Sequence, residues 1–199
     1  MSAIERWKQR VEGHHAQSLR AQGLLQRTED FWKPFAQSFR ADPRRANDPL
    51  LDRLIREVGP RKTVLDVGGG AGRLALPLAL HSHRVTVVDP SKSILSELRR
   101  GARDAGVDNV SIVEGLWEEV EVGAADIVLA AHVIYGVADV APFIAKLVRH
   151  ARDRMLIVMF MSAPQSHLAP LWRLVHGEER VQLPALPELL DVLWEIDIY

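Results

Sequence analysis

Apolar and polar positions follow a helical period over the first 60 residues of the chain. Ile4, Trp7 and Val11 recur at spacings of three and four, which is typical of one face of an amphipathic helix. Three helices are predicted in this part of the chain: residues 1–27, 28–40 and 49–58. Pro34 interrupts the second pattern, so that helix is predicted to start late or to bend there.

Aromatic residues gather in the second predicted helix, which Thr28 can cap. They are Phe31, Trp32, Phe35 and Phe39. This face either docks the helix onto the rest of the protein or lines a substrate pocket. We favour docking, because an apolar stripe on a surface helix usually packs against the core.

From residue 63 the period changes, and short apolar runs alternate with helical patterns. Five runs predict β-strands: residues 63–67, 84–89, 109–114, 125–131 and 155–161. Helices are predicted between them at residues 74–80, 91–105 and 142–151. This alternation implies right-handed crossovers and a mostly parallel sheet flanked by helices. We therefore predict a doubly wound α/β fold, with residues 1–58 as an N-terminal helical cap and residues 59–199 as the sheet domain.

The composition is that of an ordinary globular protein, with 47% apolar and 26% charged residues. A net charge of −1 argues against a protein built to neutralise phosphates, so nucleic acid is not an expected partner. The chain has no cysteine, which excludes a disulfide scaffold and a thiolate nucleophile. His81 and His83 have no nearby acid to complete a metal site, so no metal is expected.

No apolar run is long enough for a signal peptide or a membrane span. The longest is Met155–Met161, which suits a buried strand. The first residues mix charged and apolar side chains, unlike a targeting segment. The sequence therefore predicts a cytoplasmic protein without a membrane partner.

Glycines cluster where the first predicted strand meets the next helix. The segment reads VLDVGGGAGRL, with Asp66 before Gly68, Gly69 and Gly70. Glycine lets a backbone turn tightly and lets a ligand approach closely. A dinucleotide-binding loop needs a glycine at position 73, where this chain has Arg73. The carboxylate of Asp66 would repel a pyrophosphate and suits a cationic or amino-bearing ligand.

An acidic residue also ends the second predicted strand, which reads VTVVDP. Asp89 follows Asp66 by 23 residues and precedes Pro90. A carboxylate about 20 positions after a glycine loop is where a ribose diol is held. The alternative is that Asp89 only shapes the turn at Pro90.

The D-x-G-x-G-x-G spacing, followed by this acid, resembles the class I methyltransferases that use S-adenosylmethionine. The resemblance covers residues 62–161 and implies a Rossmann-like fold with S-adenosylmethionine as cofactor. It also implies cofactor-binding roles for a set of strand-end residues: Asp66, Gly68, Gly69, Gly70, Asp89, Pro90, Leu116, Trp117 and Ala131. Leu116 departs from the family, which often has an acid there beside the adenine. Trp117 fits a core position and an adenine wall equally well.

The end of the fourth predicted strand, in ADIVLAAHVIYGV, faces the transferred methyl group in that family. His132 and Tyr135 map there and are candidate catalytic residues, with His132 a candidate base because histidine titrates near neutrality. A structural, hydrogen-bonded histidine is the alternative. We predict a methyltransferase acting on a small molecule. A non-catalytic nucleotide-binding module and, less favoured, an NAD-dependent oxidoreductase are the rival hypotheses.

The segment after Met161 is short for this family, whose sheet has seven strands. It predicts helices at residues 168–176 and 188–194 and the start of a sixth strand at residues 196–199. The fifth predicted strand, MLIVMFM, would then be an edge without charge or proline, which invites association. The sequence therefore predicts either a fragment of a longer protein or a homo-oligomer that covers this edge.

Overall fold

The computed structural model describes residues 1–22, 30 and 32–199, so Thr28 and Phe31 lie outside the described residues. The chain divides into two compact units. The sheet unit consists of Thr28–Ala131 and Lys146–Ile157. The second unit consists of Met1–Arg27, His132–Ala145 and Val158–Tyr199. The boundary at residue 58 stays a prediction from the sequence.

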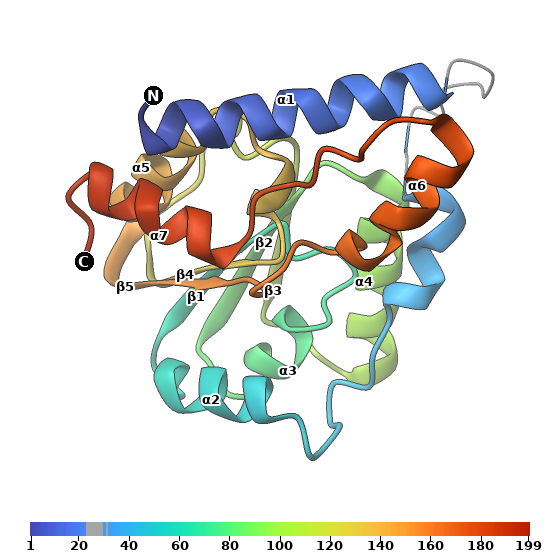
Figure 1. The fold of residues 1–199 in the computed structure, drawn as a ribbon. Coiled ribbons are helices and arrows are strands. Elements are labelled where there is room, and N and C mark those ends of the chain that lie inside the picture. The colour runs from blue at the N-terminus through green and yellow to red at the C-terminus, as the bar shows by residue number, and fades with distance from the viewer. Residues whose placement is uncertain (23–29, 31) are drawn as a thin grey trace. The chain divides into compact units, whose positions relative to one another are not determined.

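Five strands form one sheet in the order β3-β2-β1-β4-β5 (Figure 1). Their bounds are β1 Thr63–Val67, β2 Arg84–Asp89, β3 Val110–Glu114, β4 Ala125–Ala131 and β5 Ala151–Val158. The pairs β1–β2, β1–β4 and β2–β3 are parallel, as in the register Val64↔Val85 and Val64↔Ile127. The strand order changes direction beside β1, because β2 lies on one side of it and β4 on the other. In doubly wound sheets, ligands bind at such a point, outside the carboxyl ends of the strands.

The helices of the sheet unit begin within one residue of the predicted positions, and α2 begins at the predicted residue itself. They are α2 Pro49–Val58, α3 Ala75–Ala79 and α4 Lys92–Ala105. The Asp48 side chain caps α2 by accepting from the N–H of Leu51, and the Ser91 side chain caps α4 by accepting from Ile94. Helix α3 packs against β2 and β3, while α4 packs against β3. These contacts fix the two crossovers that lead out of the first strands.

The segment after residue 30 differs from its prediction. It forms a 3₁₀-helix, η1 (Lys33–Phe39), with a proline in its first turn. This 3₁₀-helix packs onto the sheet unit through Ala36, which forms a buried cluster with Ala71 and Ile94. Phe35 and Phe39 are 51% and 40% exposed, so their predicted docking is wrong. With three residues per turn, positions four apart no longer share one face.

Exposure of Trp32, at 42%, also contradicts the docking interpretation. Its ring meets that of Phe39 edge to face, with 5.4 Å between centroids. The aromatic cluster thus packs partly on itself.

The fifth strand is shifted relative to its prediction. β5 begins at Ala151 and ends at Val158, and the preceding helix α5 spans Val140–His150. Arg152, Asp153 and Arg154 are therefore exposed strand residues rather than a connection. We expected an edge strand without charged residues. That expectation is wrong for the first half of β5, which contains these three charged side chains.

The predicted sixth strand at residues 196–199 does not form. Ile196 ends α7 (Leu186–Glu195), and its N–H donates to the carbonyl of Val192. The N–H of Ile198 likewise donates to Leu193, at 2.9 Å. These N–H groups are occupied by the end of the helix and are not available to pair with a strand.

The second unit is built on α1 (Ala3–Gln22), which confirms the first predicted helix. Trp7 and Val11 are buried on one face, and the indole N–H of Trp7 donates to the carbonyl of Val137 at 2.8 Å. The remaining elements of this unit are η2 Ile134–Gly136, η3 Ser166–Leu168, α6 Ala169–His176 and α7, which packs on α1. Within the described ranges, no helix combines the length and the apolar character that crossing a bilayer requires.

Candidate functional site at the carboxyl ends of the strands

Two positions in the loop after β1 require glycine, for different reasons. A Cβ at Gly69 would lie 2.7 Å from Oδ2 of Asp66 and 2.9 Å from Val87, so no side chain fits there. Gly70 has a φ of +56°, in the left-handed region that favours glycine, and a Cβ there would be 3.5 Å from Ile94. Gly69 is therefore needed for packing within the protein, while Gly70 is needed for backbone conformation.

Asp66 lies beneath this loop and is almost fully buried, at 1% exposed. Its Oδ2 has no hydrogen-bond partner among the described residues. Burial, and then the nearby charge of Asp89, raise the pKa of Asp66 to about 7. Buried polar atoms are normally paired, so an unpaired carboxylate oxygen here indicates a place for a ligand group.

Asp89, at the end of β2, is 8% exposed and holds two backbone groups. Its Oδ2 accepts from the N–H of Gly70 at 3.1 Å, and its Oδ1 accepts from the N–H of Ser91 at 2.9 Å. Burial raises the pKa of Asp89, and these two hydrogen bonds oppose that shift. Pro90 beside it is exposed. The carboxylate thus joins the loop after β1 to the turn after β2.

Asp30 is a third carboxylate near this turn, and no pattern in the sequence selects it. It accepts from the hydroxyl of Ser91 at 2.8 Å and from the N–H of Ser93 at 3.0 Å. Its small burial favours the protonated form, but hydrogen bonds from Ser93 and Ser91 outweigh that effect and lower the pKa of Asp30 to about 2. Asp30 is 61 residues from Ser91, so no local pattern could have predicted this contact.

The two predicted site residues in the loop after β3 differ in exposure. Leu116 is 47% exposed, whereas Trp117 is 3% exposed. The indole of Trp117 meets the ring of His150 edge to face, with 5.1 Å between centroids. Trp117 therefore packs as a core residue, and Leu116 presents the exposed side of the loop.

The remaining predicted residues follow β4. Ala131 ends that strand and is half-buried in the sheet unit. His132 and Tyr135 belong to the second unit rather than to the unit that holds the glycine loop.

His132 and Tyr135 are in contact with each other. Nδ1 of His132 is 3.2 Å from the Tyr135 hydroxyl oxygen, and the N–H of Phe160 donates to that oxygen at 2.7 Å. Burial raises the pKa of Tyr135. His132 has a φ of +59°, which is uncommon for a residue with a side chain and marks a position worth testing.

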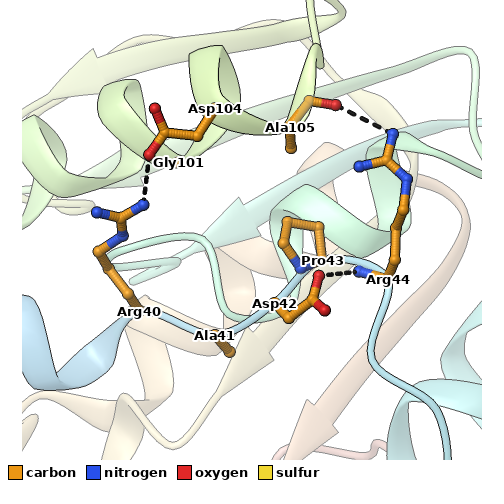
Figure 2. A pocket seen from close by; sticks show the side chains of 8 residues that line it. All are labelled: Arg40, Ala41, Asp42, Pro43, Arg44, Gly101, Asp104 and Ala105. Carbon is orange, nitrogen blue, oxygen red and sulfur yellow. Dashed lines mark hydrogen bonds and ion pairs between the residues drawn. The ribbon is translucent and has the colours of Figure 1, made fainter.

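The sheet unit also contains a cavity of about 360 Å³ (Figure 2). It is lined by Arg40, Ala41, Asp42, Pro43, Arg44, Gly101, Asp104 and Ala105. The Arg40 guanidinium donates to Asp104 at 2.6 Å, and the Arg44 guanidinium donates to the carbonyl of Ala105 at 3.0 Å. Figure 2 draws both hydrogen bonds as dashed lines. The charged groups of this cavity are engaged with the protein, and none of the predicted site residues lines it.

Three features therefore follow neighbouring strands. Buried Asp66 and the glycine loop are at the end of β1, Asp89 is at the end of β2, and exposed Leu116 is in the loop after β3. Two acids and a glycine backbone can bind ammonium and hydroxyl groups. Within the described residues, no group of three His, Cys, Asp or Glu side chains is placed to hold a metal ion.

Known proteins resemble part of this chain. A family model described as a methyltransferase domain matches residues 64–154. The tRNA 5-carboxymethoxyuridine methyltransferase of Escherichia coli K12 is 36% identical over 72 residues, which are 35% of this chain and 28% of that protein. The ubiquinone biosynthesis O-methyltransferase of Rickettsia prowazekii is 33% identical over 97 residues, 48% of this chain and 38% of that protein. The chain therefore spans about a third of the length of these relatives.

The fold is also similar to that of a solved methyltransferase structure. The crystal structure of magnesium protoporphyrin IX methyltransferase from Synechocystis PCC 6803, with bound SAH, gives a TM-score of 0.59 at 18% identity. It covers 73% of this chain and 70% of that protein. At this identity the likeness shows the fold alone.

Proposed function

We propose that the chain is a class I S-adenosylmethionine-dependent methyltransferase, which transfers a methyl group from S-adenosylmethionine to a small molecule. The match of residues 64–154 to a methyltransferase domain supports this proposal. S-adenosylmethionine is the cofactor of this family. The observation that carries the proposal is the unpaired Oδ2 of Asp66 beneath the glycine loop. A buried carboxylate without a partner fits a ligand that brings a positively charged amino group.

The cofactor site consists of strand-end residues in this proposal. Asp66 provides negative charge for the amino group, and Gly68, Gly69 and Gly70 let the backbone pass close to the methionine portion. Asp89 accepts hydrogen bonds from the ribose hydroxyls, beside Pro90. Its two oxygens each have further lone pairs beyond those used by the N–H groups of Gly70 and Ser91.

The adenine end belongs to the loop after β3, on the exposed side of Leu116. The backbone of Trp117 contributes there, while its indole supports the loop from the core. Ala131, at the end of β4 on the other side of β1, faces the methyl group. This assignment follows the strand order β3-β2-β1-β4, which lays the site along one edge of the sheet.

The sulfonium of S-adenosylmethionine is itself an activated leaving group, so the protein's main task is to position the acceptor and exclude water. His132 is the candidate base for an acceptor proton. If its Nδ1–H donates to the Tyr135 hydroxyl, the lone pair on Nε2 is the proton acceptor. In this arrangement Tyr135 orients the imidazole, because Phe160 fixes the hydroxyl in turn.

Calorimetry tests the cofactor assignment. S-adenosylhomocysteine should bind the wild-type protein, and NAD should not, because Asp66 disfavours a pyrophosphate and Arg73 replaces the third dinucleotide glycine. Binding of NAD alone would favour the oxidoreductase hypothesis.

A transfer assay with methyl-labelled S-adenosylmethionine then separates an enzyme from a non-catalytic module. Small-molecule acceptors are the first choice because the chain's charge is balanced, and tRNA is included because one relative is named as a tRNA methyltransferase. Binding without transfer to any acceptor would favour the module. The cytoplasmic location and the absence of nucleic-acid and membrane partners stay predictions.

A further inference from the structure

Lys146, in the part of α5 that belongs to the sheet unit, is a buried cationic residue without a carboxylate partner. It is 8% exposed, and its amino group makes no ion pair among the described residues. A buried charge normally costs several kcal/mol unless it is paired or well hydrogen-bonded. The residue therefore needs an explanation beyond helix packing.

All of its hydrogen bonds go to one short loop. Nζ donates to the carbonyl oxygens of Trp117 and Val120, each at 2.7 Å, and to that of Glu118 at 3.4 Å. Nζ also lies 4.8 Å from the centroid of the Trp117 ring. An ammonium group has three N–H donors, so its whole hydrogen-bonding capacity is directed at residues 117–120.

Backbone hydrogen bonds and a second side chain of α5 also hold this loop. The N–H groups of Glu119 and Val120 both donate to the carbonyl of Leu116, at 3.0 Å, which closes a single turn. His150, one helical turn after Lys146, packs its ring on Trp117, and its Nδ1 bonds to the Lys146 carbonyl at 2.7 Å. Two side chains of one helix thus clamp the buried side of the loop.

The opposite side of the same loop lies at the cofactor edge of the sheet. Glu114 is the register partner of Asp89, and the N–H of Gly115 donates to the Asp89 carbonyl at 3.1 Å. The chain therefore leaves the sheet beside the proposed ribose acid and enters the turn at Leu116, which is exposed.

We propose that Lys146 is a positioning residue for the adenine end of the cofactor site. Its buried ammonium group holds residues 116–120 in a single conformation, so that Leu116 and the adjoining backbone are preformed to contact the base. This inference rests on the proposed function, because it assumes that an adenine nucleoside occupies the edge beside Asp89. Lys146 itself does not touch the ligand.

The test compares Lys146→Met with Lys62→Met. Methionine keeps the length and apolar stem of Lys146 but donates no hydrogen bond. Lys62 is a half-buried lysine of the same unit that pairs with Asp153, and its loss controls for the removal of a charge. Calorimetry measures the dissociation constants of S-adenosylhomocysteine and of its hypoxanthine counterpart, S-inosylhomocysteine, well below the melting temperature.

In the wild type, the preformed loop should distinguish adenine from hypoxanthine. In Lys146→Met, that preference should fall by about two- to tenfold, the factor of one neutral hydrogen bond. Lys62→Met should keep the wild-type preference. A Lys146→Met protein with a lower melting temperature but an unchanged preference would overturn the proposal, because a purely structural role lowers stability alone.

Hydrogen exchange of the wild type, without ligand, keeps the proposal testable if Lys146→Met does not fold. The amides of Glu119 and Val120 should be protected before any ligand is added. Unprotected exchange would show that Lys146 does not fix the loop. If the wild type binds no S-adenosylhomocysteine, the proposed function fails instead, which is a distinct result.

Discussion

The backbone N–H of Gly70 donates a hydrogen bond to Oδ2 of Asp89, with 3.1 Å between nitrogen and oxygen. The two residues follow neighbouring parallel strands, β1 and β2. Their hydrogen bond fixes the glycine loop against the acid that is proposed to hold the ribose. The two parts of the site are therefore in place before a ligand arrives, which lowers the ordering cost of binding.

Replacing Asp89 by alanine should weaken S-adenosylmethionine binding by about 1.5–3 kcal/mol, the range for hydrogen bonds to a charged group. The fold should persist, because Asp89 is at a strand end. Calorimetry measures the affinity, and Asp104→Ala, which removes an exposed acid from α4, is the control. An unchanged affinity would remove Asp89 from the ribose role.

Replacing Gly70 by valine should abolish cofactor binding while circular dichroism stays largely native. The φ of +56° strains any side chain there, and a Cβ would lie 3.5 Å from Ile94, so the loop backbone that is proposed to pass the methionine portion would have to shift. Gly106→Val is the matched control, since Gly106 has a φ of +66° and a Cβ added there would meet no atom within 4 Å. It carries the same backbone strain at the end of α4, and should bind normally.

The stability of the ligand-free protein should fall as pH rises from about 4 to about 7. Asp66 keeps its proton up to a pKa of about 7 in the folded state, whereas the unfolded chain releases it near 3.8. In this window the folded state binds more protons than the unfolded state, so stability declines with pH, by at most about 4 kcal/mol. Urea unfolding at several pH values measures the slope, which Asp66→Asn should reduce.

Cofactor binding should release a proton near pH 7. A positively charged amino group beside Asp66 favours the carboxylate, so the bound state has a lower pKa for this residue. The affinity for S-adenosylhomocysteine should therefore rise between about pH 6 and pH 8. Calorimetric titrations in buffers of different ionisation enthalpy measure the number of protons released on binding. An equal proton count in Asp66→Asn would assign the release to another group.

Tyr135→Phe should destabilise the protein by about 0.5–1.5 kcal/mol, the net contribution of one hydrogen bond, because the bond that is lost is only partly buried. The substitution leaves the N–H of Phe160 without its acceptor and removes the contact with His132. Chemical unfolding measures the loss, and Tyr199→Phe, at a 94% exposed position, is the control. Equal stability of the two variants would show that the hydroxyl is not needed for folding.

Association through β5 is a prediction that light scattering can check. β5 is the last strand in the order of the sheet, and its second half, from Met155 to Val158, carries no charge. An edge of this kind pairs with other chains unless it is covered. A stable monomer at high protein concentration would contradict the prediction, and the exposed charges from Arg152 to Arg154 would be the physical reason.

The sequence alone determined the alternation of strands and helices and the residues at the strand ends. The period of apolar residues sets these elements, and β1, β2 and β4 begin and end where the pattern predicts. The glycine loop and its acids were also readable, because a strand, a tight turn and a carboxylate leave local signals in the chain. At β5 the prediction was wrong only in the bounds of the strand, whereas the predicted strand at residues 196–199 does not exist, because the end of α7 takes up its N–H groups.

Only the tertiary structure decided what lies beneath and beside these residues. The core position of the Trp117 indole depends on α5, which is 29 residues further along the chain at Lys146. The contact of Asp30 with Ser91 spans 61 residues. The unpaired oxygen of Asp66 follows from the packing of the glycine loop above it. Burial and long-range hydrogen bonds arise when distant segments meet, and no period or spacing within one segment encodes them.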